Sequence, residues 1–279
     1  CNTAHKSRGG SIPVHPSSRE NCTSMQYFTS VSADRAQCFN LRHQPFYEYD
    51  LSSPSIRRMR IGPTALTLEW AQFLPQSLEY LDWDMGDESA LDESALLFLL
   101  SQPSLKRLSV RFRDQRIVHT LSKCLKQSKF LEHLDLRNNV MGDEGVRVLV
   151  NGIFHSGVSS LNLGFNLIGD CGATALGHWL AHPHCRLVHL DLNCNLIGNR
   201  GAQAMAAALR HNDKLKSLVL HGNSRMSCGN PFVECLHRNI TLENCDLQRT
   251  EVENINVINY FLTLNKCGRK ILKVDDVPG

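Results

Sequence analysis

Residues 131–149 read LEHLDLRNNVMGDEGVRVL, residues 158–176 read VSSLNLGFNLIGDCGATAL, and residues 187–205 read LVHLDLNCNLIGNRGAQAM. A fourth copy begins at residues 215–223 with LKSLVLHGN. The copies start 27, 29 and 28 residues apart, and a fixed period of this size indicates structural units that stack side by side. One such unit cannot bury its apolar face alone, so the stacking of neighbours must supply the core.

Each copy predicts a short β-strand followed by a turn and a helix. Leu134 and Leu136 alternate with polar residues, so the leucines face one side of the strand and the polar residues face the other. Apolar residues then recur at the spacing of one helix face, as at Val146, Leu149, Val150 and Ile153. The sequence therefore predicts alternating strands and helices.

Asparagine and glycine hold fixed places in the turns between these strands and helices. We expect the asparagine amides to be buried and bonded to the backbone of their own and adjacent repeats; they are Asn139, Asn166, Asn195 and Asn223. The first glycine of each turn is predicted to have a positive φ, at Gly142, Gly169 and Gly198. The second is predicted to allow a close approach at the helix start, at Gly145, Gly172 and Gly201.

The repeated phrase L-x-x-L-x-L-x-x-N, followed by an apolar residue, Gly, a polar pair and Gly, resembles the leucine-rich repeats of the ribonuclease-inhibitor-like class. That class includes NLR receptors and Ran GTPase activators. The resemblance implies an α/β leucine-rich repeat solenoid, or horseshoe, with parallel strands on the concave side and helices on the convex side. It implies little about function, since this fold mostly presents surface to other proteins.

The strand pattern continues on both sides of the regular copies. Further strands are predicted to begin at Leu105, Leu78 and Ile56 on the N-terminal side and at Leu242 on the C-terminal side, which gives eight strands. The three N-terminal copies lack the asparagine, because Arg113, Gly86 and Thr64 hold its place. We therefore expect less regular loops in that part of the chain.

Three regions follow from this pattern. Residues 1–50 include a stretch rich in Gly, Ser and Pro and sustain no period, so they are expected to form a flexible arm and a cap over the first repeat. Residues 51–250 form the repeats, and residues 251–279 form a closing helix and a tail. The aromatic residues expected in the cap are Phe28, Phe39, Phe46, Tyr47 and Tyr49. The apolar face of the closing helix is expected to carry Ile255, Ile258, Phe261 and Leu262, with Gly268 as its stop.

Composition argues against several classes of partner. The 30 basic and 27 acidic residues nearly balance, and the chain has no long run of like charge, so we expect neither nucleic acid nor a membrane surface as a partner. The 11 cysteines are odd in number and unevenly spaced, which favours reduced thiols and a cytoplasmic location. The chain begins at Cys1 rather than Met, so we expect a fragment or a processed product.

No catalytic or cofactor-binding motif is apparent, and the sequence predicts a protein that is not an enzyme and carries no cofactor. The one cluster of potential metal ligands is His182-Pro183-His184-Cys185. Zinc usually requires about four ligands at suitable spacings. An ordinary exposed loop is therefore favoured over a metal site.

Polar and aromatic residues at outward strand positions form the candidate protein-binding surface. Arginine grips carboxylates through two hydrogen bonds, and an adjacent carboxylate can orient it, while an aromatic residue would add apolar contact. The residues chosen on this basis are Arg107, Arg111, Phe112, His133, Asp135 and Arg137. A solvated polar face that binds nothing in particular is the competing interpretation.

Three functional hypotheses remain open from the sequence. The first is a protein-interaction module or scaffold that binds a protein partner of unknown identity through its concave face. The second, from another class, is a GTPase-activating protein that resembles the Ran activator, although the acidic C-terminal run of that family is absent here. The third is the ligand-sensing repeat region of an NLR-like receptor.

Overall fold

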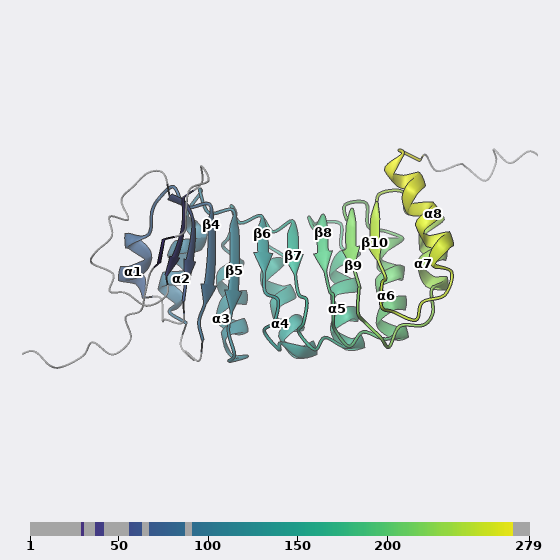
Figure 1. The fold of residues 1–279 in the computed structure, drawn as a ribbon, viewed down its shortest axis with the longest axis horizontal. Helices are drawn as coiled ribbons and strands as arrows, with labels where there is room; N and C mark the ends of the chain where they lie inside the picture. The colour runs from purple at the N-terminus through teal and green to yellow at the C-terminus, as the bar shows by residue number, and fades with distance from the viewer. Residues whose placement is uncertain (1–28, 31–36, 42–55, 63–66, 87–90, 270–279) are drawn as a thin grey trace, which may run out of the picture.

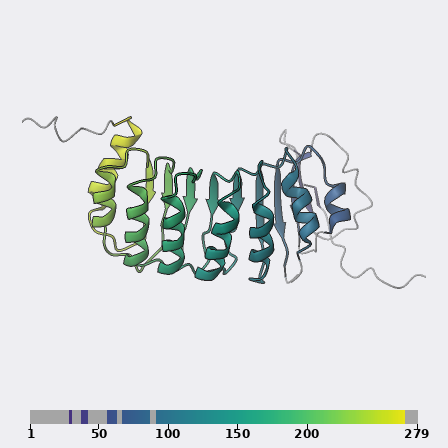
Figure 2. The ribbon, with the colours of Figure 1, turned by 180° about the vertical axis from the view of Figure 1, so that it is seen from behind.

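The computed structural model describes residues 29–30, 37–41, 56–62, 67–86 and 91–269, and gives backbone alone for the first two of these ranges. Figure 1 shows an elongated molecule in which a layer of strands lies against a layer of helices. Figure 2, seen from behind, shows the helices side by side over one face of the sheet. The other face of the sheet, here called the open face, is not covered by any of the described helices.

The described residues form one sheet of ten strands in sequence order and eight helices. The strands are β1 (Thr29–Ser30), β2 (Gln37–Leu41), β3 (Ile56–Ile61), β4 (Tyr80–Asp84), β5 (Arg107–Arg111), β6 (His133–Asp135), β7 (Ser160–Asn162), β8 (His189–Asp191), β9 (Ser217–Val219) and β10 (Asn244–Asp246). The helices are α1 (Leu68–Phe73), α2 (Glu93–Ser101), α3 (Ile117–Leu125), α4 (Gly142–Ile153), α5 (Asp170–Leu180), α6 (Asn199–Leu209), α7 (Asn230–Leu236) and α8 (Ile255–Lys266).

The predicted α/β solenoid is confirmed, together with its strand register. Strands β2 to β10 pair in parallel with their sequence neighbours, and β1 pairs antiparallel with β2. Leu108 of β5 pairs with Leu134 of β6, which is the alignment that the repeat period predicts. The sequence pattern missed β1 and β2, because residues 1–50 sustain no period. The side chains expected to form an aromatic cap lie outside the residues described in full.

A single apolar core runs along the whole stack between the two layers. The inward leucines of adjacent strands, such as Leu134 and Leu161, are 1% exposed. They meet helix residues such as Leu149, which is fully buried. Each fully buried side chain of this size stabilises the fold by about 1.5–3 kcal/mol, so every repeat depends on its neighbours for stability.

The turn asparagines are buried and link adjacent repeats, as predicted. The Asn166 Nδ2 donates to the carbonyl oxygens of Leu136 (2.9 Å) and Gly164 (3.1 Å). Its Oδ1 accepts from the backbone N–H groups of Asn139 (3.1 Å) and Met141 (3.3 Å). The same bonding recurs at Asn195 and Asn223. One amide thus satisfies backbone groups in two repeats that would otherwise be costly to bury.

The glycine predictions are right at some positions and wrong at others. Gly142 has φ +61°, as expected, whereas Gly169 (φ −100°) and Gly198 (φ −108°) are extended N-cap residues. Positive φ occurs instead beside the buried asparagines, for example at Phe165 and Leu167. The buried asparagine side chain bonds to the backbone of these turns, and the residues beside it adopt the left-handed conformation.

The N-termini of α5 and α6 are capped from the preceding repeat. The Oδ1 of Asp143 accepts from the N–H groups of Gly169 (2.6 Å) and Gly172 (2.9 Å). A Cβ on Gly172 would lie 2.7 Å from that oxygen, which confirms the predicted close approach. Asp170 caps the next helix in the same way, through Gly198 and Gly201. These carboxylates supply the acceptors that the glycine N-caps lack.

Helix α8 packs against α7 at the C-terminal end of the described stack. Ile258 and Leu262 are buried, whereas Ile255 is 37% exposed. Gly268 has φ +78°, and the N–H of Arg269 donates to the carbonyl of Leu264 at 2.9 Å. This is the backbone pattern of a glycine-terminated helix.

Candidate interaction surface

Five of the six predicted site residues lie on the open face of the sheet, on β5, β6 and the turn after β6. The register pairs Arg107 with His133. Adjacent strands in a sheet are about 5 Å apart, so side chains on the two strands can contact one partner group. We call these five residues the arginine surface: Arg107, Arg111, His133, Asp135 and Arg137.

Arg111 is already bound to a carboxylate within the molecule. Its Nη2 donates to both carboxylate oxygens of Asp82, at 3.1 and 3.2 Å. Arg60 lies 3.3 Å from the same carboxylate, so Asp82 bridges guanidinium groups on β3 and β5. The Arg111 Nε is buried without a hydrogen-bond partner among the described residues, and lies 3.9 Å from Asp84. Arg111 is thus held in place with one donor unused.

Asp135 orients the guanidinium of Arg137, which follows it two positions later. Its Oδ2 lies 3.2 Å from the Arg137 Nε, and its Oδ1 accepts from the Arg137 backbone N–H at 3.0 Å. The sequence predicted that Asp135 could orient an arginine, and the structure identifies which one. Both ends of Arg137 are therefore tied to the same carboxylate.

Arg107 differs from the other two arginines because it forms no ion pair with another residue in the described ranges. It affects its strand neighbour electrostatically. Burial of the His133 imidazole lowers its pKa, and the charge of Arg107 lowers that pKa further. The charge of Arg107 therefore acts on the neighbouring strand β6.

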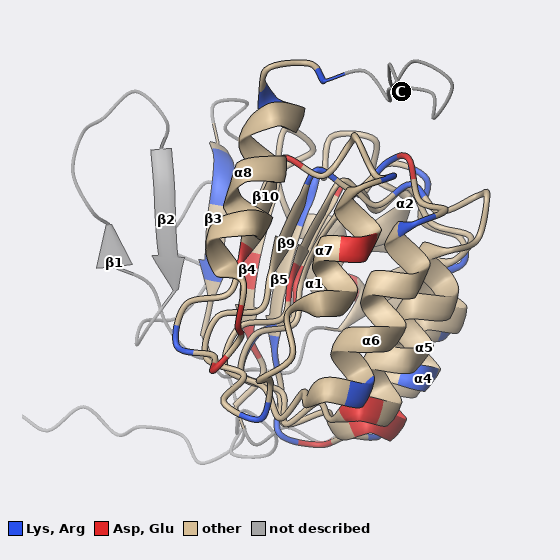
Figure 3. Ribbon diagram, turned by 90° about the vertical axis from the view of Figure 1, so that its right-hand side faces the viewer, with Lys and Arg blue, Asp and Glu red and all other residues tan. Residues whose placement is uncertain are grey.

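Tyr80 and Asp82 on β4 extend this surface toward the N-terminal end. Burial raises the pKa of the Tyr80 hydroxyl, and the nearby charge of Asp82 raises it further. Figure 3 shows the mixture of blue and red segments on the strands. The strand period of two residues puts Tyr80 and Asp82 at outward positions, but it does not identify Asp82 as the shared partner of two arginines. The alternation of basic and acidic rows across β3, β4 and β5 was the available signal.

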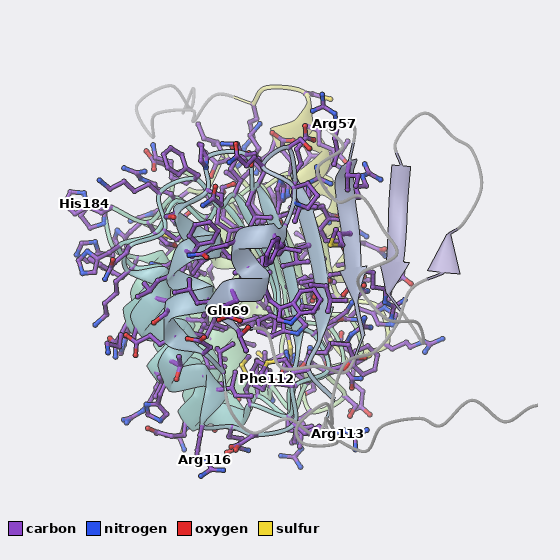
Figure 4. All side chains as sticks on the ribbon, turned by 90° about the vertical axis from the view of Figure 1, so that its left-hand side faces the viewer. Arg57, Glu69, Phe112, Arg113, Arg116 and His184 are labelled. Atoms are coloured by element: carbon purple, nitrogen blue, oxygen red, sulfur yellow. The ribbon has the colours of Figure 1, made fainter. Side chains whose placement is uncertain are left out.

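The prediction that Phe112 offers apolar contact on this surface is wrong. Its side chain is 3% exposed and belongs to the core, and its N–H donates to the Asn139 Oδ1 at 2.7 Å. In the regular repeats the equivalent residues, Asn138 and Phe165, have positive φ and are exposed. Arg113 takes the place of the turn asparagine after Phe112. The alternation of inward and outward side chains along β5 therefore continues for one more residue, and Phe112 points inward. Figure 4 labels Phe112 and Arg113.

The histidine cluster between α5 and β8 does not form a metal site in the described part of the chain. The imidazole rings of His182 and His184 have centroids 5.3 Å apart, and Cys185 is 3% exposed. Within the ranges given above, no group of three or more His, Cys, Asp or Glu side chains could hold a metal ion.

None of the described helices is both long enough and apolar enough to span a bilayer. The eight cysteines whose side chains are described are free thiols. Burial raises the pKa of the Cys124 thiol to about 11 and that of Cys235 to about 12. These thiols remain protonated at neutral pH and pack as small apolar groups.

Comparisons with known proteins agree with this architecture. A family model described as "Leucine Rich repeat" matches residues 127–150 and 184–206. NACHT, LRR and PYD domains-containing protein 3 of Bos taurus is 27% identical over 188 residues, which are 54% of this chain and 18% of that protein. NACHT, LRR and PYD domains-containing protein 14 of Mus musculus is 28% identical over 213 residues, which are 64% of this chain and 21% of that protein. The chain thus spans about a fifth of the length of the curated relatives it matches.

Similar solved structures include an internalin from Listeria monocytogenes and the leucine-rich repeat-containing protein LegL7 from Legionella pneumophila. The internalin is 17% identical with a TM-score of 0.48, and the match covers 76% of this chain and 55% of that one. LegL7 is 14% identical with a TM-score of 0.47, and the match covers 80% of this chain and 84% of that one. The chain is built of ribonuclease-inhibitor-like leucine-rich repeats and is distantly homologous to the repeat regions of NLRP proteins.

Proposed function

We propose that this leucine-rich repeat chain is a protein-interaction module that binds a protein partner through the arginine surface on the open face of its sheet. The observation that carries the proposal is the unequal pairing of its arginines. Arg111 and Arg137 are each held by an internal carboxylate, whereas Arg107 has none in the described ranges. A partner carboxylate would complete this arrangement at Arg107.

The surface has the properties of a binding site with little need to reorganise. Two guanidinium groups are fixed by Asp82 and Asp135, so less side-chain entropy is lost when a partner arrives. Arginine is also enriched among the residues that dominate interface energies. The apolar contact expected from Phe112 is replaced in this proposal by Tyr80, which lies on the adjacent strand and is partly exposed.

The relatives favour the repeat region of an NLR-like receptor over a GTPase activator as the setting for this module. The relatives that the chain matches are named as NACHT, LRR and PYD domains-containing proteins rather than as GTPase activators, and no residue of this chain can be given a catalytic role by resemblance. Under this proposal the protein acts in the cytoplasm by binding a partner. The activity of any longer protein that contains this chain would then depend on its other regions.

Quantitative affinity purification from the native source tests the proposal with matched variants. Arg107→Glu is expected to reduce recovery of a specific partner about tenfold or more, since an attractive charge contact becomes repulsive. Arg200→Glu, at an exposed position of α6, makes the same charge change away from the open face. Equal loss with both variants, or loss with Arg200→Glu alone, would show that the arginine surface is not the binding site.

A further inference from the structure

A second surface lies where the helices return to the strands. The loops between α3 and β6, α4 and β7, α5 and β8, and α6 and β9 enclose a hollow of about 820 Å³, which is within the size range of ligand sites. Figure 4 shows His184 projecting at this edge, while Arg113 and Arg116 lie at the opposite edge, where strands lead into helices. The hollow is therefore separate from the turns that hold the asparagine ladder.

The described lining of this hollow includes five basic residues and no carboxylate. They are Lys129, His155, His184, Arg186 and Lys214. Lys214 lies 3.2 Å from Asp213, but Lys129 and Arg186 have no ion-pair partner among the described side chains. Both are exposed. The hollow therefore concentrates positive charge in a chain whose total charge is close to balance.

Close packing between successive loops holds these groups together. The N–H of Gly157 donates to the carbonyl of Ser128 at 3.0 Å, and a Cβ on Gly157 would lie 2.6 Å from the carbonyl oxygen of Lys129. Glycine is required there by this close approach. The loop before β7 is consequently pressed against the loop that carries Lys129.

An aromatic row fixes the histidine side of the hollow. The ring of Phe154 packs edge-on against His155 and His182, with centroids 4.9 and 4.6 Å apart. The Nδ1 of His182 accepts from the N–H of His184 at 3.2 Å. Phe154, together with Pro183, also gives the hollow an apolar wall. A ligand that carries both negative charge and an apolar group would match these two kinds of lining.

The length of the hollow points to a chain rather than to a single ion. Lys129 and Lys214 stand three repeats apart, and three steps of about 4.8 Å between strands amount to about 14 Å. One small anion cannot contact both ends. An extended peptide advances about 3.3–3.6 Å per residue, so four or five residues would span the distance.

We propose that this hollow is a second binding site, which takes a short acidic peptide segment of a partner protein. Carboxylates of the segment pair with Lys129, Arg186 and Lys214, and an apolar side chain between them packs on Phe154 and Pro183. The hollow and the arginine surface are separate sites. A single partner can bind at both sites, or two partners can bind at one site each. If the hollow does not bind the peptide, the proposed binding of a partner at the open face is not affected.

Fluorescence anisotropy with the whole chain tests this site. The probe is a fluorescein-labelled peptide of sequence Glu-Glu-Leu-Glu-Glu, and its matched control is Gln-Gln-Leu-Gln-Gln. The acidic probe is expected to bind about tenfold or more tightly than the control, and its binding should weaken as salt is raised, because exposed charges are screened. Equal binding of the two peptides would overturn the proposal.

Variants locate the binding on the molecule. The double change Lys129→Glu and Arg186→Glu should weaken the acidic probe about tenfold or more, and the milder change of both residues to Gln should weaken it by a smaller factor. Arg200→Glu with Arg225→Glu makes the same change of charge at the opposite edge and should alter binding by less than about twofold. Arg107→Glu should likewise leave the probe bound. Circular dichroism melting curves confirm that each variant is folded.

Inorganic phosphate distinguishes a peptide site from a general anion site. Phosphate at the ionic strength of the assay is expected to displace the probe no more than sodium chloride does. If phosphate binds more tightly than the peptide, or if the opposite-edge variants weaken the probe as much as the Lys129 and Arg186 variants do, the peptide site is refuted.

Discussion

The regular repeats between residues 131 and 223 and the degenerate repeats between residues 56 and 125 share a register but are joined by different interactions. In the regular part, buried asparagines such as Asn166 and capping aspartates such as Asp143 connect each repeat to the next through the backbone. In the degenerate part, partly exposed ion pairs also connect the repeats, as where Asp82 bridges Arg60 and Arg111. Buried hydrogen bonds hold successive repeats in a uniform stack, whereas partly exposed ion pairs keep charged groups at the surface.

The asparagine ladder should show the largest effect on stability. Asn166→Ala removes four hydrogen bonds to buried backbone groups and should lower the free energy of unfolding by about 1–3 kcal/mol. Asn162→Ala is the control, because Asn162 is only half-buried and accepts one bond, from the N–H of Gly164. Chemical denaturation measures both changes. Equal losses would contradict the difference between the buried ladder and the open face.

The aspartate caps should show an effect of intermediate size. Asp143→Ala removes the acceptor for two N–H groups at the start of α5 and should cost about 1 kcal/mol. Glu144→Ala is the matched control, since Glu144 is exposed and pairs only with Arg147 on its own helix. Amide hydrogen exchange at Gly169 and Gly172 should become faster in the first variant. Unchanged exchange there would mean that the cap does not hold the helix start.

The partly exposed bridge of the degenerate repeats should matter less for stability. Asp82→Asn removes the charge that joins Arg60 to Arg111, and the loss of unfolding free energy should stay below about 1 kcal/mol because solvent screens partly exposed pairs. The loss should shrink further at high salt. Thermal melts at two salt concentrations measure it. A loss larger than that of Asn166→Ala would reverse the comparison between the two regions.

The pKa of His133 should show the smallest energetic effect and the sharpest test of the surface electrostatics. Burial is the larger cause of its lowered pKa and Arg107 the smaller, so Arg107→Gln should raise that pKa while leaving it below its ordinary value of about 6.5. NMR titration of the imidazole measures the change. No rise would mean that Arg107 does not act on His133.

The same lowered pKa has a consequence for stability. The unfolded chain binds more protons at this histidine between its ordinary pKa and its lowered one, so the contribution of His133 to stability falls as the pH decreases through that window. The Arg107→Gln variant should show a smaller fall. The two chains are compared by denaturation at pH values above and within the window.

Much of the candidate site was predictable from the sequence, because outward strand positions follow from the period of two residues. Arg107, His133 and Asp135 lie where the register placed them. Phe112 was not predictable in this way, because its direction depends on the conformation of a turn without the asparagine. The hollow beside Lys129 was not predictable either, because its lining comes from loops of four different repeats.

The sequence by itself determined the repeat period, the eight predicted strands and the burial of Asn166 and its equivalents, because each of these depends on a local pattern that recurs. The tertiary structure alone decided that Asp82 binds Arg111, that Asp143 caps α5 and that Phe112 turns inward. Each of these depends on side chains more than twenty residues apart in sequence that stacking brings into contact. A period predicts which repeats are neighbours, but the shapes of the turns determine which of their atoms meet.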